Sequence, residues 1–249
     1  MMTKNFNSLY ILLLASACNI SVANANEVAS ATTVQKVTAS TPAKAASAPI
    51  AIKSGVFVTT TPCDVDSPCG VVSDTSKKVL EAVNRGVPSN QTVSLINSVA
   101  APQFDFTLMT KYALGNNWKL ATPAQQQQLV DLFKQLLIYT YSTALSKFKG
   151  AQITITSSNI TDGKKAAVMS SFIMPNTTNN QPIKVEYDLA KPTSTSTWKA
   201  YDIKIENTSL VTTYRNQFND VVQTSKIEGL IKQLETKVSS LKGNSTKDS

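Results

Sequence analysis

The chain has 249 residues, no histidine, and a formal net charge of +8 from 24 basic and 16 acidic residues. The absence of histidine excludes histidine-dependent catalytic triads, HExxH zinc sites and Cys/His zinc fingers, because histidine is the usual general base and metal ligand. A hydrophobic share of 42% with 16% charged residues supplies a sizeable core for one or two domains and excludes a wholly disordered chain.

The positive charge is spread along the chain rather than concentrated in runs. Residues 70–225 hold 15 basic and 10 acidic residues, which leaves a net +5. Arginine, the preferred side chain for bidentate phosphate and base contacts, occurs only as Arg85 and Arg215. We therefore predict no nucleic-acid binding and only a general affinity for anionic surfaces.

The first 25 residues have the three parts of a secretory signal peptide. Lys4 precedes the apolar stretch 9–15, and Ala23-Asn24-Ala25 forms an A-x-A cleavage signal. The apolar stretch is too short for a membrane span. The segment around Cys18 also loosely resembles a lipoprotein cleavage site, so anchoring at Cys18 is the alternative to export as a soluble protein.

Residues 26–69 predict a low-complexity tether that ends in a small cysteine loop. The segment is rich in Ala, Thr, Ser and Val and has no amphipathic period. Cleavage of the signal peptide leaves Cys63 and Cys69 as an even pair, for which we predict a disulfide in an oxidising compartment. Metal binding is a weaker alternative, because Asp64 and Asp66 are the only nearby additional ligands.

Three helices are predicted between residues 74 and 149. Asp74 is the expected N-cap of a helix that ends at Gly86, and a second helical stretch covers Val93–Val99. The clearest helix runs over Pro123–Lys149, with Thr122 as its N-cap and an apolar residue at every third or fourth position.

The pattern then changes to period two, which indicates strands at 153–156, 166–174, 183–189 and 198–206. Ile183, Val185, Tyr187 and Leu189 share one face, and turn residues between the strands favour an antiparallel meander with one covered face. Helices at 209–223 and 227–241 follow, and residues 237–249 are expected to be a polar tail. Helices, then a meander, then helices indicate an α+β fold.

An ordered set of motifs over residues 72–236 resembles the MlaC or toluene-tolerance family of periplasmic phospholipid-binding proteins. The set begins with Pro102-Gln103-Phe104-Asp105-Phe106, Ala113-Leu114-Gly115 with Trp118, and the helix that starts at Thr122-Pro123. It continues with Pro182-Ile183-Lys184-Val185-Glu186-Tyr187, Trp198-Lys199-Ala200-Tyr201-Asp202-Ile203 and Tyr214-Arg215-Asn216-Gln217-Phe218.

The resemblance implies a periplasmic carrier that moves glycerophospholipids between outer and inner membranes and so maintains outer-membrane lipid asymmetry. It implies an NTF2-like antiparallel sheet packed by helices around an apolar lipid pocket, with an added helical part, over residues 70–236. The implied partners are an MlaA-type outer-membrane lipoprotein complex and an inner-membrane MCE-domain ABC transporter of the MlaD type. Phospholipid is the cargo, and no cofactor, metal or enzymatic reaction is expected.

The candidate lipid contacts are residues of the apolar helix stripes and of the predicted inner strand face. For each of them ordinary core packing is the competing interpretation. The set consists of Leu136, Leu137, Tyr141, Val168, Ser170, Ile183, Val185, Tyr187, Tyr201, Ile203, Leu210, Tyr214 and Phe218.

Arg215 interrupts an apolar helix and has two interpretations: contact with a lipid phosphate or a partner, or an ion pair with Asp202 or Asp220.

Two other classes of function stay open beside the carrier. One is an exported NTF2-like enzyme, although no nucleophile-elbow motif is present. The other is a structural or adhesion module that uses the tether as a stalk.

Overall fold

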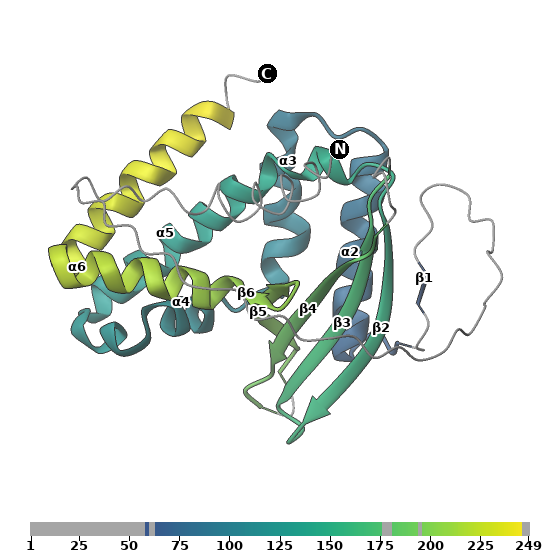
Figure 1. Ribbon diagram of the computed structural model, residues 1–249, viewed down its shortest axis with the longest axis horizontal. Coiled ribbons are helices and arrows are strands. Elements are labelled where there is room, and N and C mark those ends of the chain that lie inside the picture. The colour runs from purple at the N-terminus through teal and green to yellow at the C-terminus, as the bar shows by residue number, and fades with distance from the viewer. Residues whose placement is uncertain (1–57, 60–62, 176–180, 194–195, 246–249) are drawn as a thin grey trace, which may run out of the picture.

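The computed structural model describes residues 58–59, 63–175, 181–193 and 196–245 (Figure 1). The predicted signal peptide and most of the tether lie outside these residues. The described chain contains these elements in order: β1 (Val58–Thr59), α2 (Pro68–Asn84), α3 (Ser89–Leu95), η1 (Ile96–Ala100), η2 (Ala101–Gln103), α4 (Phe106–Leu114), η3 (Gly115–Leu120), α5 (Pro123–Ser142), η4 (Leu145–Phe148), β2 (Gln152–Thr161), β3 (Lys165–Ile173), β4 (Ile183–Ala190), β5 (Lys199–Ile205), β6 (Thr208–Ser209) and α6 (Leu210–Ser245).

The strands form one sheet in the order β1-β2-β3-β4-β5-β6. Strands β2 to β6 pair antiparallel in sequence order, and the two-residue β1 is added parallel to β2 at the edge. The predicted α+β class and the antiparallel meander are confirmed. The meander follows from the short connections between successive strands, which leave each strand beside its predecessor.

Helix α2 begins six residues before the predicted N-cap. Ser67, not Asp74, caps it by accepting a hydrogen bond from the Gly70 amide at 3.1 Å. Asp74 lies inside the helix and pairs with Lys78, four residues on, at 2.6 Å. The sequence pattern missed this turn because its residues carry no apolar period.

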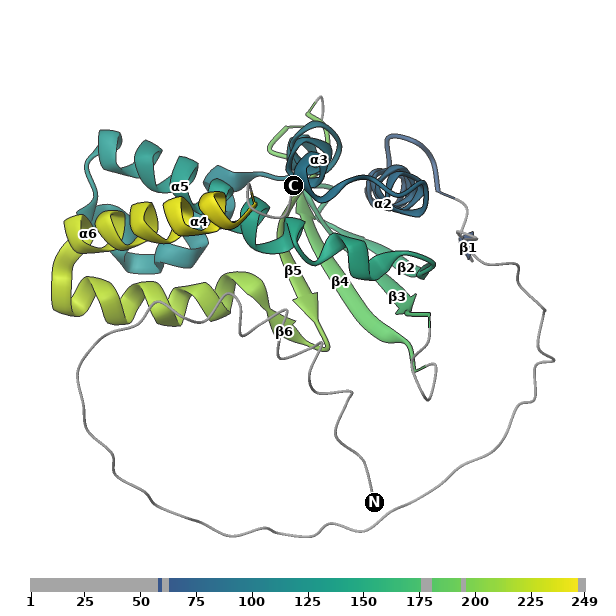
Figure 2. The same cartoon turned by 90° about the horizontal axis from the view of Figure 1, so that it is seen from above.

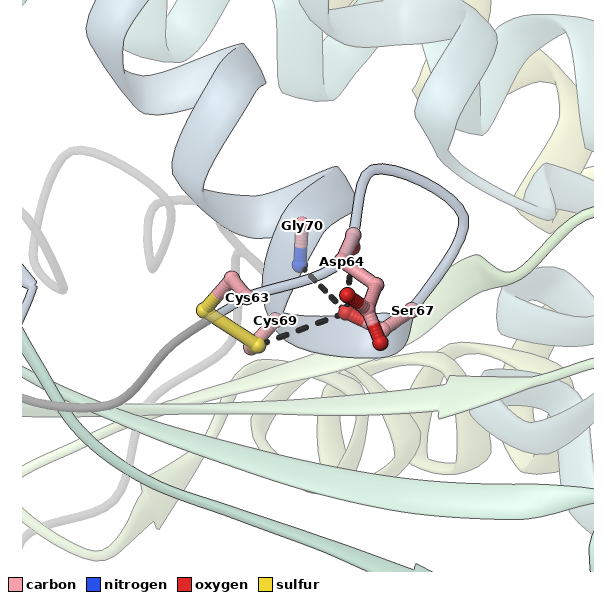
Figure 3. Close-up of a disulfide and its surroundings, with 5 residues drawn as sticks. All are labelled: Cys63, Asp64, Ser67, Cys69 and Gly70. Atoms are coloured by element: carbon pink, nitrogen blue, oxygen red, sulfur yellow. Dashed lines mark hydrogen bonds between the residues drawn. A yellow bond between two sulfur atoms is a disulfide. The ribbon is translucent and has the colours of Figure 1, made fainter.

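The predicted disulfide between Cys63 and Cys69 is present and closes a loop over the first turn of α2 (Figure 3). The Ser67 hydroxyl lies inside this loop and donates a hydrogen bond to the Asp64 carbonyl at 2.6 Å. A Cβ atom at position 70 would collide with the Asp64 and Val65 carbonyls, so the loop closes this tightly because Gly70 has no side chain.

Helix α5 starts as predicted, and a helix before it was not predicted. Thr122 and Gln125 form a reciprocal capping box at the start of α5. The helix ends at Ser142 rather than Lys149, and η4 follows it. The unpredicted α4 is capped by Asp105, whose own amide donates to the Ala200 carbonyl of β5 at 2.9 Å. That bond joins α4 to the sheet.

Helix α6 is a helical hairpin, in agreement with the two predicted helices. Lys226 has φ 62° and ψ −171°, which breaks the helical backbone between them. Both views show the second arm folding back beside the first (Figures 1 and 2). The second arm continues to Ser245 and buries Val238, so the boundary of the predicted polar tail at residue 237 is wrong.

The helices form two groups around the sheet. Helix α2 packs on β2 and β3, while the main contacts of α3 are with η1 and α5. Helices α4, α5 and α6 pack on one another beside the β5 edge (Figure 2). Their buried side chains form what we call the helical core, which centres on Phe133, Tyr214 and Phe218. None of the helices in the described ranges is both long and apolar enough to span a bilayer.

Candidate functional site

The helix-facing side of the sheet carries rows of apolar residues held in register across β3, β4 and β5. Val168 pairs with Tyr187 and Tyr187 with Ile203. The next row towards the β4 start consists of Ser170, Val185 and Ile205, and Phe172 then pairs with Ile183. Residues in one row point to the same side of a sheet, so these side chains share a face.

This face holds two clusters that differ in how completely they are covered. The filled cluster contains the fully buried row Ala166, Leu189 and Ala200, together with Ile155, Val168 and Trp198 and with Cys69 and Val72 of α2. The open cluster contains Leu80 of α2 with Ala151, Ile153, Phe172, Met174 and Val185, and its further members Phe148, Ile183, Tyr187, Ile203 and Ile205 are only partly buried.

The incomplete burial is concentrated on β4 and β5, beside the strands that α2 covers. On β3 the side chains of Val168, Ser170 and Phe172 are at most 9% exposed. Their row neighbours Ile203 and Ile205 keep accessible surface although they lie on the helix-facing side. Apolar side chains that point inward and still contact solvent are typical of the lining of a ligand pocket.

Tyr187 brings a hydroxyl group into this apolar surface. Burial raises the pKa of Tyr187 to about 12, and hydrogen bonds to Ser170 and Ser76 oppose that rise. The side chain packs against both the filled and the open cluster, and yet it is not fully closed off from solvent. Both properties fit a ring that borders an internal space. Ser170 in turn donates to the Val185 carbonyl at 3.1 Å.

The structure separates the predicted lipid contacts into two places. Those on the sheet lie together: Val168 is in the filled cluster, Ser170 bonds within the same face, and Ile183, Val185, Tyr187 and Ile203 are in or against the open cluster. Leu136, Leu137, Leu210, Tyr214 and Phe218 are buried in the helical core, and Tyr141 packs against it. The period of a helix does not tell which of two neighbouring cores its apolar stripe faces.

Tyr201 is also placed away from the open cluster, because β5 has an irregular register. Asp188 pairs with Asp202 but the next residue, Leu189, pairs with Ala200, so Tyr201 is an extra residue in β5. Its ring packs edge-on against Tyr112 of α4, with 5.5 Å between centroids, and contacts the helical core. The structure therefore places Tyr201, a predicted lipid contact, against the helical core and not in the open cluster with Ile203.

Arg215 and Asp202 have structural partners that the sequence did not indicate. The Arg215 Nε donates to the Tyr112 carbonyl at 2.7 Å, in the last turn of α4, where a cation is favourable. Asp202 accepts hydrogen bonds from the Val211 amide at 3.0 Å and from the Ser209 hydroxyl, and so caps α6. The suggested Arg215–Asp202 pair is replaced by these two helix-end interactions.

The opposite side of β4 and β5 carries charged residues. Lys204 lies 2.8 Å from both Glu186 and Asp188. Burial by itself lowers the pKa of Lys204, but the two carboxylates outweigh burial and raise it. Burial raises the pKa of Asp188 against the opposing effect of Lys204. The lysine bridges the two strands and offsets the charge of the carboxylates.

A groove of about 300 Å³ lies between η1 and α5, away from the apolar sheet face. Its lining is Asn97, Asp131, Lys134, Gln135, Ile138 and Tyr139. Four of these six side chains are polar or charged, which does not suit an acyl chain. Within the described ranges, no cluster of three or more Cys, Asp or Glu residues could hold a metal ion.

Several residues of the open cluster were not among the sequence candidates. These residues are Ile205, Phe148, Phe172, Leu80 and Ser76. The period-two pattern of β5 contained the signal for Ile205. For the others, the signal depends on which helix covers which strand.

Comparison with known proteins identifies relatives of this architecture. A family model described as MlaC protein matches residues 73–236. Toluene tolerance protein Ttg2D of Pseudomonas putida is 27% identical over 136 residues, which cover 54% of this chain and 60% of that relative, less than two thirds of its length.

A solved structure is also similar: the phospholipid-binding protein from Ralstonia solanacearum in complex with a phospholipid. It has 30% sequence identity and a TM-score of 0.62, covering 70% of this chain and 98% of the other. The family model spans well over half of the sequence, from within α2 into the second arm of α6. On this evidence the chain belongs to the MlaC family.

Proposed function

We propose that this protein is a periplasmic carrier of glycerophospholipids, which binds the acyl chains against the open cluster. The carrying observation is the set of partly exposed apolar side chains on the helix-facing side of β4 and β5. The similar Ralstonia solanacearum protein, nearly all of which aligns with this chain, is described with a bound phospholipid. Binding and release suffice for this function, and no chemical step is required.

The energetics of such a site are favourable. Burying a methylene contributes about 0.8 kcal/mol, so a dozen methylenes contribute on the order of 10 kcal/mol. Water-exposed head groups need only a weakly basic surrounding, which a spread net charge provides. An apolar lining with few polar groups therefore holds a lipid without a dedicated charged site.

The transport route belongs to the same proposal. The carrier would move phospholipid between an MlaA-type outer-membrane lipoprotein complex and an inner-membrane MCE-domain ABC transporter of the MlaD type, and so maintain outer-membrane asymmetry. Support comes from membership of the MlaC family and from the secretory pattern of residues 1–25. Co-purification of the full chain with each partner tests this route.

Native mass spectrometry of protein purified from the periplasm, followed by organic extraction, tests lipid binding directly. The expected result is a folded protein that carries phospholipid and, after delipidation, takes it up from liposomes. Protein that is folded, lipid-free and unable to load from liposomes would overturn the proposal. Hydrolysis of generic ester substrates would favour the alternative of an exported enzyme.

Two variants of the open cluster and one control variant test the location of the lipid site. Ile203→Asp places a charge in the open cluster and is expected to abolish uptake, as is Val185→Arg. Ile160→Asp is the control, because Ile160 lies on the same sheet and is 56% exposed. Normal loading by folded Ile203→Asp would place the lipid elsewhere.

A further inference from the structure

Tyr187 lies where the two sheet-face clusters meet. It is the only side chain, among the described residues of these clusters, that packs against both the filled and the open cluster. Its row neighbours show the same division, since Val168 belongs to the filled cluster and Ile203 packs against the open one.

Accessible apolar surface is found on only one side of this row. On one side of Tyr187 lies the row of Ala166, Leu189 and Ala200, whose side chains are at most 5% exposed. On the other side Ile205 and Ile183 keep accessible surface, while Val185 between them on the sheet is 7% exposed. A space that follows β4 from its start at Ile183 therefore ends at the Tyr187 row, because the next row is already filled by protein side chains.

The Tyr187 ring is also held from two directions. Its hydroxyl group has hydrogen-bond partners on β3, at Ser170, and on α2, at Ser76. The ring thus reaches from β4 towards the helix that covers the neighbouring strands. A ring whose hydroxyl group is tied to two elements resists displacement by a ligand better than a free side chain does.

From these observations we infer that Tyr187 forms the closed end of the acyl-chain space and so sets the longest chain that this carrier accepts. The inference rests on the proposed function and adds a specificity-determining residue to it. A buried tyrosine covers about 150–250 Å², and a methylene about 30 Å² at the usual conversion of area to free energy. Removing the ring therefore makes room for about five methylenes.

Competitive loading tests this inference. Delipidated full-length mature protein is incubated with vesicles of phosphatidylglycerols that share one head group and differ only in acyl-chain length. Native mass spectrometry then gives the distribution of bound chain lengths. Tyr187→Ala is expected to shift the upper limit towards longer chains by about five carbons. Tyr201→Ala is the matched control, since its ring packs against the helical core, and no shift is expected.

Two further variants make the test robust. Ile203→Phe adds bulk in the Tyr187 row and is expected to shift the limit towards shorter chains, which decides the matter if Tyr187→Ala does not fold. Tyr187→Phe keeps the ring and is expected to keep the limit of the unmodified protein. A folded Tyr187→Ala protein with an unchanged distribution overturns the inference, and so does an unchanged distribution in Ile203→Phe.

The outcome also separates this inference from the proposed function. If the unmodified protein and Tyr201→Ala both fail to load any phosphatidylglycerol, the carrier function itself is wrong. If both load normally and Tyr187→Ala has the same chain-length limit as the unmodified protein, only the role of Tyr187 is wrong.

Discussion

The helical core and the open cluster contain the same kinds of apolar side chain but differ in how they are covered. In the helical core, Phe133 packs edge-on against Tyr214 and Phe218, with ring centroids 4.9 and 5.3 Å apart, and all three are fully buried. In the open cluster, Ile203 and Ile205 point under the helices and keep accessible surface. The comparison teaches that coverage, not composition, separates a stabilising core from a surface available to cargo.

The largest expected effect is the loss of stability when a ring is removed from the helical core, compared with the open cluster. Phe133→Ala is expected to lower the free energy of unfolding by about 3–5 kcal/mol, because it leaves a cavity among packed helices. Phe148→Ala, in the partly buried open cluster, should cost clearly less. Urea unfolding followed by tryptophan fluorescence measures both. Equal losses for the two variants would contradict the comparison.

The next largest effect is a loss of folding stability at high pH that comes from the titration of Tyr187. The folded-state pKa of Tyr187, about 12, lies above the ordinary value of 10.0. The neutral phenol is therefore favoured in the folded state, and its stabilisation is complete below pH 10 and lost as the pH rises through 12. The loss is about 2–3 kcal/mol.

Tyr187→Phe lacks this titration, so its stability relative to the unmodified protein is expected to improve between pH 10 and pH 12. Unfolding free energies of the two proteins across that interval measure the change. A constant difference at every pH would show that Tyr187 titrates normally and is not deeply embedded.

Removing the disulfide tests how much the first turn of α2, which packs on the filled cluster, contributes to stability. Replacing both Cys63 and Cys69 by serine opens a loop with a sequence separation of 6, which is expected to cost about 2 kcal/mol through the entropy of the unfolded chain. Lipid loading should change little, because Cys69 packs in the filled cluster. Loss of loading without loss of stability in thermal melts would instead couple this loop to the cargo space.

The smallest expected loss of stability comes from a substitution in the open cluster that should also weaken lipid binding. Ile205→Ala is expected to lower the unfolding free energy by only about 1 kcal/mol, since the side chain is partly exposed. The lipid dissociation constant should rise roughly tenfold, because about two methylenes of contact are lost. Ile160→Ala is the control and should change neither quantity. Fluorescent-lipid titration gives the affinities.

Much of the fold could be predicted from local patterns. The N-cap at Thr122, the period-two strands and the break near Lys226 each depend on a few neighbouring residues, and the structure agrees with all three. The N-cap of α2 was missed because the disulfide loop, rather than an apolar period, determines where that helix starts. Helix α4 was missed because it is short and depends on the hydrogen bond of Asp105 to Ala200 of β5.

The candidate site could be predicted only in part. Alternation along β4 correctly grouped Ile183, Val185 and Tyr187, since period two assigns a face directly. The same reasoning did not place Tyr201, because β5 has one extra residue there and Tyr201 packs against the helical core. The helix stripes of α5 and α6 were correctly read as apolar, but most of their candidates lie in the helical core.

The sequence by itself determined the α+β class, the antiparallel order of the strands, the cysteine pair and the family, because these depend on local periodicity, spacing and ordered motifs. Only the tertiary structure decided which apolar residues are packed by protein and which remain open to a ligand. The physical reason is that burial depends on what lies opposite a side chain, and the residues opposite β4 and β5 come from helices distant in sequence.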